Sequence, residues 1–355
     1  MAIFRLLHAS DLHIALKQNR VGLVDAWKAG LLFRRDRPEV ALTSSHSPDL
    51  LDGLIEFVFQ QDDPFDAVLL SGDLATTGKK EDLKEASSWI NGDQNGYVSP
   101  HSGRPEIASN PTLKGAARKI VLLPGNHDRY QNIPGIPFFV PGGILFNNYF
   151  GVDWDFNPKV KVNKWVSPHK EGAHLGLVSA DLTLKKFSDA ENGLFGVRGS
   201  FGQGKAYADI IDALKKKTDD LREKHRGLGL LWVVHFPPKY PKIEEDFLQL
   251  LQDEILIKAA HEKRISHILA GHTHKPLAYT ARSSDGSTVE VLCAGTATQL
   301  FAPDGNFIHQ LMIEIEGEEV TSVRSRTFRW HDQVGAREKN ADQIWVPVVC
   351  PKKKA

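Results

Sequence analysis

The sequence predicts an α/β fold in which strands and helices alternate along most of the chain. Short apolar runs such as residues 120–123 and 228–234 are typical of buried strands. Residues 50–58 place apolar side chains at helical spacing, which predicts an amphipathic helix. From residue 277 on, the sequence pattern predicts strands without intervening helices. We expect these strands, joined by turns, at 277–282, 288–293, 307–315 and 320–328.

The first elements follow from local signals. A strand at residues 4–7 opens the chain, and an irregular segment at 15–47 comes after it. Ser47 followed by Pro48 predicts a helix start, because proline is tolerated at the first helical position. The elements expected next are a strand within 66–73, a helix at 79–90 closed by Asn91-Gly92, and the strand at 120–123.

Two more irregular segments, 92–117 and 131–173, interrupt the second quarter of the chain. We interpret them as insertions rather than linkers, because long loops in a compact domain usually serve a function. The elements expected after them are strands at 174–180, 228–234 and 266–270 and helices at 205–225 and 243–263. We expect one domain over 1–306 and a C-terminal β-strand extension over 307–355 that packs on it.

Composition narrows the class of protein. The chain has 355 residues, with 44 basic and 44 acidic side chains, so its net charge gives no reason to expect nucleic acid or an anionic membrane as partner. Two cysteines argue against a disulfide scaffold and against cysteine-ligated zinc. No apolar run has the length of a signal peptide or a membrane span, so we expect a soluble, cytoplasmic protein of unknown oligomeric state.

Five of the predicted strands end abruptly in side chains that can ligate metals. The carboxyl ends of strands in α/β sheets meet at the edge where such folds bind their ligands. We therefore expect these side chains to form one site. They are Asp11 and His13, Asp73, Asn126 with His127 and Asp128, His235, and His272 with His274.

The residue types predict a pair of metal ions. Residues two apart in an extended segment point the same way, so Asp11 and His13 are expected to bind one ion together. Asp73 can bridge two ions through its two oxygens, and the ligands that complete the set are Asn126, His235, His272 and His274. Nitrogen and oxygen ligands without a thiolate suit manganese, iron, zinc or cobalt, so the identity of the metals stays open.

The charge of this site favours a phosphate. Two divalent ions, less Asp11, Asp73 and a shared hydroxide, leave one positive charge, and that hydroxide is the expected in-line nucleophile. His127 has no ligand role, so we expect it to protonate the leaving oxygen or to stabilise the transition state. Asp128 is expected to orient His127 or to cap the following turn.

These motifs resemble, in order and in strand context, the five motifs of the calcineurin-like metallophosphoesterases. The resemblance covers residues 3 to 300 and implies a four-layer α/β/β/α sandwich of two mixed sheets, with a catalytic domain that carries the three insertions. It also implies that Asp11, His13 and His274 hold one metal, that Asp73 bridges, and that Asn126, His235 and His272 hold the other. The motifs are Asp11-Leu12-His13, Gly72-Asp73, Gly125-Asn126-His127-Asp128, His235 and Gly271-His272-Thr273-His274.

The first and last motifs are similar to the cyclic-nucleotide phosphodiesterase branch of that family. They imply a dinuclear phosphodiesterase that acts on a cyclic nucleotide or another small phosphodiester. A DNA nuclease and a phosphomonoesterase or protein phosphatase on the same scaffold are alternatives. A binding protein without catalysis is a further alternative, which the complete set of motif residues disfavours.

Three other features receive structural interpretations. We expect His8 to be a structural residue of the first strand, and His46, His101 and His169 to be solvated loop residues. The stretch from Gly199 to Ala206 has the spacing of a phosphate-binding loop, but Ala206 lacks the hydroxyl that would hold magnesium. We therefore predict a flexible loop and a helix start there.

Overall fold

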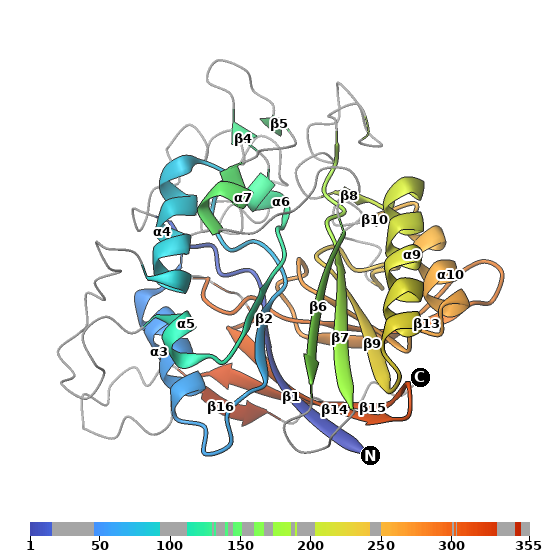
Figure 1. Cartoon of the computed structure of the whole chain (residues 1–355). Helices are drawn as coiled ribbons and strands as arrows, with labels where there is room; N and C mark the ends of the chain where they lie inside the picture. The colour runs from blue at the N-terminus through green and yellow to red at the C-terminus, as the bar shows by residue number, and fades with distance from the viewer. Residues whose placement is uncertain are drawn as a thin grey trace.

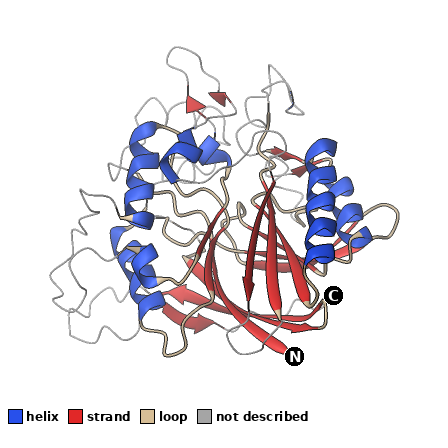
Figure 2. Cartoon of the chain, in the orientation of Figure 1, coloured by secondary structure: helices blue, strands red, loops and turns tan. Residues whose placement is uncertain are grey.

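Two six-stranded mixed sheets face each other, and helices cover their outer faces (Figure 1). This arrangement confirms the predicted α/β fold of two mixed sheets. The computed structural model describes residues 1–15, 46–92, 112–129, 131–132, 139–140, 145–150, 160–166, 173–185, 189, 203–241, 250–299, 302, 304–331 and 345–348. Figure 2 shows the helices flanking the two sheets in the same orientation.

The first sheet has the strand order β16-β15-β14-β1-β2-β3. β1, β2 and β3 run parallel to each other, and β14 lies antiparallel against β1, so that Phe4 pairs with Ile313. The strands predicted as a C-terminal extension therefore lie in the same sheet as the first strand. The bounds are β1 Ala2–Ala9, β2 Ala67–Leu70, β3 Ile120–Leu122, β14 Phe307–Glu316, β15 Glu319–Trp330 and β16 Trp345–Val348.

The second sheet has the order β12-β13-β11-β9-β7-β6. Its four central strands are parallel, and an antiparallel strand closes each edge. Parallel strands buried on both faces need continuous apolar runs, and all seven residues of β9 are buried. The bounds are β6 Val160–Val166, β7 His174–Ala180, β9 Leu228–Val234, β11 His267–Ala270, β12 Leu277–Arg282 and β13 Thr288–Cys293.

The helices form the two outer layers. α3 (Pro48–Phe59), α4 (Lys80–Asn91) and α5 (Leu113–Ala116) flank the first sheet, and α9 (Ala208–Lys224) and α10 (Asp253–Glu262) flank the second (Figure 1). Ser47 precedes α3 with an extended φ of −94°, and Pro48 opens the helix as predicted, although the Ser47 side chain makes no cap bond. The short elements are α6 Asn126–Arg129, α7 Leu145–Phe150, β4 Gln131–Asn132, β5 Phe139–Val140, β8 Gly204–Lys205 and β10 Leu250–Leu251.

The core follows the alternation of side chains along the strands. In β9, Leu231 and Val233 belong to the cluster that fills the space between the sheets, whereas Trp232 and Val234 pack towards the outer helices. The Trp232 indole donates to Thr218 Oγ1 of α9 at 3.0 Å, so this buried polar atom is satisfied. The apolar strands thus hold four layers together.

The structure corrects three expectations. Of the helix predicted at 243–263, residues 243–249 lie outside the described part of the chain, Leu250–Leu251 forms β10 instead, and the helix begins at Asp253. The predicted insertion at 131–173 contains β6, which pairs along its whole length with β7. Gly204–Lys205 of the phosphate-loop look-alike forms β8, while the rest of that stretch before residue 203 lies outside the described residues.

Most of the predicted segment at 15–47 and of that at 92–117 also lies outside the described residues. Within the part of the chain that the structure describes, no helix has the length and apolarity to span a membrane.

Candidate metal centre

The seven predicted metal ligands converge at the carboxyl ends of the strands. Ligand atoms of Asp11, His13, Asp73 and His274 lie within 4.8 Å of one another, and the same holds for Asp73, His235 and His272. Asn126 joins the second group, because its Oδ1 lies 3.1 Å from Nε2 of His235. Asp73 belongs to both groups, which is the arrangement expected of a bridging residue.

Both sheets contribute to this centre. The turns after β1, β2 and β3 of the first sheet carry Asp11 and His13, Asp73 and Asn126 respectively. His235 follows β9 of the second sheet, and His272 and His274 follow β11. Each cluster therefore combines residues of the first sheet with residues of the second, and the centre lies at the junction between them.

The backbone of the ligands is left-handed at five positions, with φ between 51° and 68°. Such values are uncommon for residues with a side chain and cost about 1–3 kcal/mol each. Asp11 and His13 therefore meet by a turn and not by the extended alternation we predicted, and the amides of both are held by the carbonyls of Gly72 and Asp73 at 3.0 Å. The five residues are Asp11, His13, Asp73, His272 and His274.

Two glycines let the turns approach each other closely. A Cβ on Gly125 would overlap the carboxylate of Asp73, and a Cβ on Gly72 would overlap the ring of His235. Gly72 also has a φ of 112°, which disfavours any other residue. The Gly-Asp and Gly-Asn pairs in the motifs thus have a steric reason.

The buried carboxylates have oxygens that fit a cation. Asp11 Oδ2 accepts from the His272 amide at 3.0 Å, and Asp73 Oδ1 accepts from the His127 amide at 2.8 Å. The other oxygen of each makes no hydrogen bond and lies 3.2 or 3.3 Å from Nε2 of His274 or His235. A buried charge without such bonds is costly unless a cation compensates it, so these oxygens fit metal ligands.

Charge around the site follows from the two carboxylates. Burial alone would raise the pKa of Asp11 and of Asp73, but facing histidines outweigh it and hold both pKa values below their usual range. Burial would lower the pKa of His235, yet Asp73 raises it to about 9, and Asp11 likewise raises that of His274. The same field that favours a protonated imidazole favours a divalent cation.

Hydrogen bonds fix which nitrogen of two histidines faces the centre. His235 Nδ1 donates to the Ser71 carbonyl at 2.8 Å, and His274 Nδ1 lies 3.0 Å from Gln299 Oε1. The Nε2 atoms of both rings therefore face the centre. Oxygen atoms that bind the outer nitrogen of a histidine commonly orient the ring towards a metal. Burial lowers the pKa of His272 to about 3, so that imidazole is neutral, as a metal ligand must be.

His127 lies at the rim of the first cluster. Its ring meets the ring of His13 edge-on, with centroids 4.6 Å apart, and it is half-buried where His13 is fully buried. Its Nδ1 lies 2.7 Å from the carbonyl oxygen of Thr76, which can only accept. Nδ1 therefore carries the proton, and Nε2 is the nitrogen without a proton in the neutral ring.

Asp128 does not orient the His127 ring, which was the first of the two roles predicted for it. Its carboxylate accepts from the backbone amides of Gly125, Leu74 and Ala75 at 2.9, 3.2 and 2.8 Å, and Thr76 holds the His127 ring instead. Burial, with the charge of Asp73, raises the pKa of Asp128 to about 7. Asp128 thus fixes the turns that carry Asp73 and Asn126.

Sequence reasoning missed a buried ion pair behind the site. Arg129 and Asp181 are both fully buried, with Arg129 Nη2 3.1 Å from Asp181 Oδ2. The pair links the turn after β3 to the turn after β7, and therefore links the two sheets. A signal existed, because β7 is one more apolar run that ends in aspartate.

His8 and His46 are buried although neither belongs to the ligand set. His8 Nε2 lies 2.8 Å from Ser71 Oγ, in line with the structural role expected for it. The prediction of a solvated His46 was wrong, because only 3% of its surface is exposed and its Nδ1 accepts from the Ala15 amide at 3.1 Å. His101 and His169 lie outside the described residues.

Comparison with known proteins places these observations in a family context. Residues 4–276 match the sequence model of the calcineurin-like phosphoesterase family. No protein of curated function matches the sequence.

Solved structures of similar proteins have low identity to this chain. A dimetal phosphatase from Danio rerio has 13% identity over 92% of this chain and 99% of its own, with a TM-score of 0.48. A purple acid phosphatase from yellow lupin (Lupinus luteus) seeds has 12% identity over 91% and 53%, with a TM-score of 0.45. A single mutant of Vps29 from Entamoeba histolytica has 12% identity over 93% and 94%, with a TM-score of 0.32.

Proposed function

The chain belongs to the calcineurin-like phosphoesterase family, and on that premise we propose that it is a two-metal phosphodiesterase that acts on a small phosphodiester. Phosphoester hydrolysis is the chemistry of the family, and the two residue clusters fit a dinuclear metal centre. The observation that carries the proposal is Asp73, which lies in both clusters. The preference for a diester over a monoester is a narrower proposal than phosphoester hydrolysis.

The residues assigned to each metal follow the clusters. Asp11, His13 and His274 would hold one ion, Asn126, His235 and His272 the other, and Asp73 both. When bound, such a pair supplies positive charge for the phosphate and lowers the pKa of a bound water. Five of the seven side chains are neutral when they ligate, so two carboxylates leave a net positive site for an anionic substrate.

His127 is the group proposed to act on the substrate itself. Because Thr76 fixes the proton on Nδ1, His127 can reach a phosphate oxygen or a leaving oxygen only through Nε2. When it is protonated, Nε2 donates to that oxygen and can deliver its proton as the ester bond breaks. Its partial exposure beside the buried His13 is consistent with contact to a substrate.

The diester preference rests on two motifs. Asp11-Leu12-His13 and Gly271-His272-Thr273-His274 are similar to those of the cyclic-nucleotide phosphodiesterase branch. The alkoxide or phenoxide that leaves gains from a proton donor such as His127 in diesters and monoesters alike, so the preference rests on the motifs.

The test is a substrate comparison with the full chain. We expect bis(p-nitrophenyl) phosphate and a cyclic nucleotide to be hydrolysed faster than p-nitrophenyl phosphate, with activity lost after chelation and restored by Mn²⁺. The matched control is Asp73→Asn, which keeps the volume of the side chain and removes the shared charge.

Three outcomes discriminate. Faster turnover of the monoester would replace the phosphodiesterase by a phosphomonoesterase on the same centre. Cleavage of DNA without cleavage of small diesters would make it a nuclease. Metal-loaded protein with no turnover of any phosphoester would reject catalysis and leave the binding-protein alternative.

A further inference from the structure

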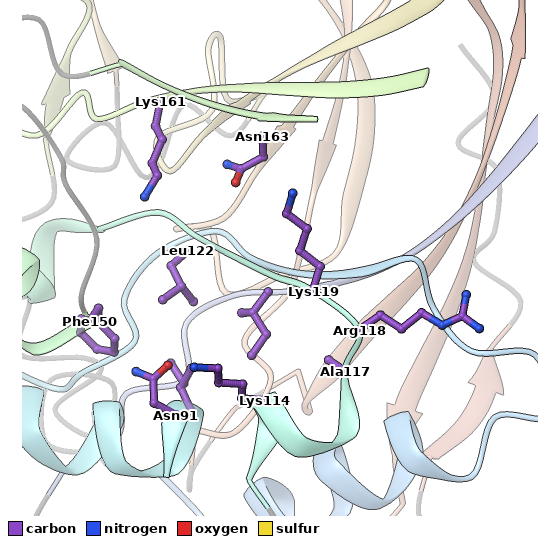
Figure 3. A pocket seen from close by; sticks show the side chains of 11 residues that line it. Asn91, Lys114, Ala117, Arg118, Lys119, Leu122, Phe150, Lys161 and Asn163 are labelled. Atoms are coloured by element: carbon purple, nitrogen blue, oxygen red, sulfur yellow. The ribbon is translucent and has the colours of Figure 1, made fainter. Parts of the chain in front are cut away.

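The two sides of the sandwich differ in what lies beside the metal centre. At the outer strands β3 and β6 there is a cavity of about 340 Å³, and none of its lining residues belongs to the two metal-ligand clusters (Figure 3). On the other side of β1 the chain leaves β13 of the second sheet, and β14 of the first sheet follows in the sequence. Residues 296–299 between these two strands, here called the crossing segment, contact the turns that carry Asp11 and His274. The crossing segment therefore supports ligands of the first cluster.

The crossing segment holds the backbone of both ligand turns. Thr296 Oγ1 donates to the Asp11 carbonyl at 2.8 Å, and the Thr298 hydroxyl donates to the Leu12 carbonyl. The Thr296 amide donates to the His274 carbonyl at 3.2 Å. A left-handed turn keeps its costly conformation only where surrounding contacts fix it. The crossing segment supplies such contacts to a turn of each sheet.

Gln299 holds the His274 side chain itself. Of the seven predicted ligands, His274 alone is not buried, and 34% of its side chain is exposed. Its Nε2 lies 3.2 Å from Asp11 Oδ1, and a ring that ligates a metal through Nε2 carries its proton on Nδ1. Gln299 Oε1, 3.0 Å from Nδ1, is the acceptor for that proton. Without this acceptor the exposed imidazole is free to rotate, and metal binding then has to order it.

Gln299 is itself fixed by its surroundings. It is buried, and its backbone carbonyl accepts from Asn306 Nδ2 at 3.0 Å. Its backbone also pairs with His46 in an antiparallel bridge. The His46 ring in turn accepts from the Ala15 amide at 3.1 Å, two residues after His13. The acceptor for His274 is therefore part of a buried network that also reaches the His13 turn.

The second cluster is oriented by other parts of the chain. His235 Nδ1 donates to the carbonyl of Ser71, a backbone atom that no substitution removes. The turn that carries Asn126 is held by the Asp128 carboxylate, which accepts from the Gly125 amide. None of these bonds involves the crossing segment. The two ions should therefore respond differently to a change at Gln299.

We propose that Gln299 is a positioning residue for the ion held by Asp11, His13 and His274, and that it sets the affinity of this ion separately from that of the other. The proposal rests on the two-metal centre proposed above. Removal of a group that orients a ligating histidine commonly costs about 10–100-fold in metal affinity. Because Gln299 acts through His274, its effect appears in metal binding even when no substrate is present.

The test is a titration of the metal-free full chain with Co²⁺, followed by visible absorption and by calorimetry. Gln299→Met keeps the length of the side chain and removes the acceptor. We expect one Co²⁺ to bind about 10–100-fold more weakly, while the other binds as in the wild type. His13→Ala removes a ligand of the first cluster only, and therefore identifies the affected binding step.

Two further variants separate positioning from a loss of packing. Gln299→Glu keeps an oxygen acceptor for Nδ1 and should bind both ions at least as tightly as the wild type, because a carboxylate is the stronger acceptor. Gln310→Met changes a buried glutamine of β14 and should leave both affinities unchanged. Equal weakening of both ions in Gln299→Met overturns the proposal, and so does an equal loss in Gln299→Met and Gln299→Glu.

Metal binding and turnover are measured separately, so this inference and the proposed function can fail independently. Selective weakening of one ion in Gln299→Met supports the inference even if no phosphoester is hydrolysed. Hydrolysis of diesters with unchanged Co²⁺ affinities in Gln299→Met overturns the inference and leaves the proposed function standing. A wild type that binds no Co²⁺ overturns both.

Discussion

The strands and the turns that follow them obey opposite rules. In β9 every residue is apolar or glycine and buried, and the backbone is regular. The turn after β1 buries Asp11 and His13, both with a left-handed backbone. Burying one leucine side chain contributes about 1.5–3 kcal/mol, which matches the cost of about one left-handed ligand residue. The strands therefore stabilise a fold in which the turns are strained and charged.

This contrast predicts that changes in the turns alter chemistry while changes in the strands alter stability. The largest effect should come from His127→Asn, where the asparagine amide replaces Nδ1 and can still donate to the Thr76 carbonyl but cannot deliver a proton. We expect kcat to fall by about 10²–10⁴-fold with metal content unchanged. Rate measurements with metal analysis on the same sample test this. Loss of metal in parallel with rate would make His127 a ligand instead.

The ion pair of Arg129 and Asp181 shares features of both regions, because it is charged like the turns and buried like the strands. Arg129→Met leaves Asp181 charged and buried, and we expect it to lower the free energy of unfolding by about 3–5 kcal/mol. Adding Asp181→Asn removes the unpaired charge and keeps the Oδ1 acceptor for Thr183, so it should recover part of the loss. Chemical denaturation of the single and double variants measures this. Equal stability of both variants would mean that the pair carries no charge penalty.

A substitution in a strand should change stability and leave activity unchanged. Leu231→Ala in β9 removes a fully buried side chain between the sheets, and we expect a loss of about 2–5 kcal/mol in unfolding free energy. Activity per folded molecule and metal content should stay unchanged. A fall in kcat at full occupancy would show that the strands also tune the turns.

The smallest expected effect is the change of folding stability with pH. Burial lowers the pKa of His8 to about 3 and of His309 to about 4, whereas both titrate near 6.5 in the unfolded chain. The unfolded state therefore takes up protons first, so stability is lost as pH falls from 6.5 towards 4, by about 1 kcal/mol per histidine at pH 5.5. His309→Gln should make the melting temperature fall less steeply as pH is lowered, which thermal unfolding at several pH values measures. An unchanged slope would place the acid sensitivity elsewhere.

Sequence reasoning succeeded best where a strand is a short apolar or alternating run between clear turn signals. β7, β9, β12 and β13 begin and end at their predicted residues. β6 was missed because the alternation of Val160 and Val162 with Lys161 and Asn163 is short, breaks at Lys164 and lies inside a long irregular stretch. The helix predicted from residue 243 was too long, because apolar periodicity does not show where a chain first forms a short strand.

The candidate site was predicted in composition but not in backbone geometry. Motif residues at strand ends identified the seven side chains that the structure brings together. Aspartate and histidine adopt positive φ more often than most residues, but the sequence does not show which of them do so here, because these values arise with pairing between turns such as that of His13 with Asp73. The apolar run at 174–180 points to Asp181, but nothing in the sequence identifies Arg129 as its partner, since the pair joins distant segments through tertiary packing.

The central place of β14 has a consequence for folding order. β1, which leads into the first ligand turn, is flanked by β2 on one side and on the other by a strand from near the end of the sequence. Contacts of such wide sequence separation form slowly, because a long loop must close before they are made. A ribosome has to deliver the chain as far as β14 before β1 gains its second neighbour, so the catalytic end of this sheet should mature later than the parts that pair locally.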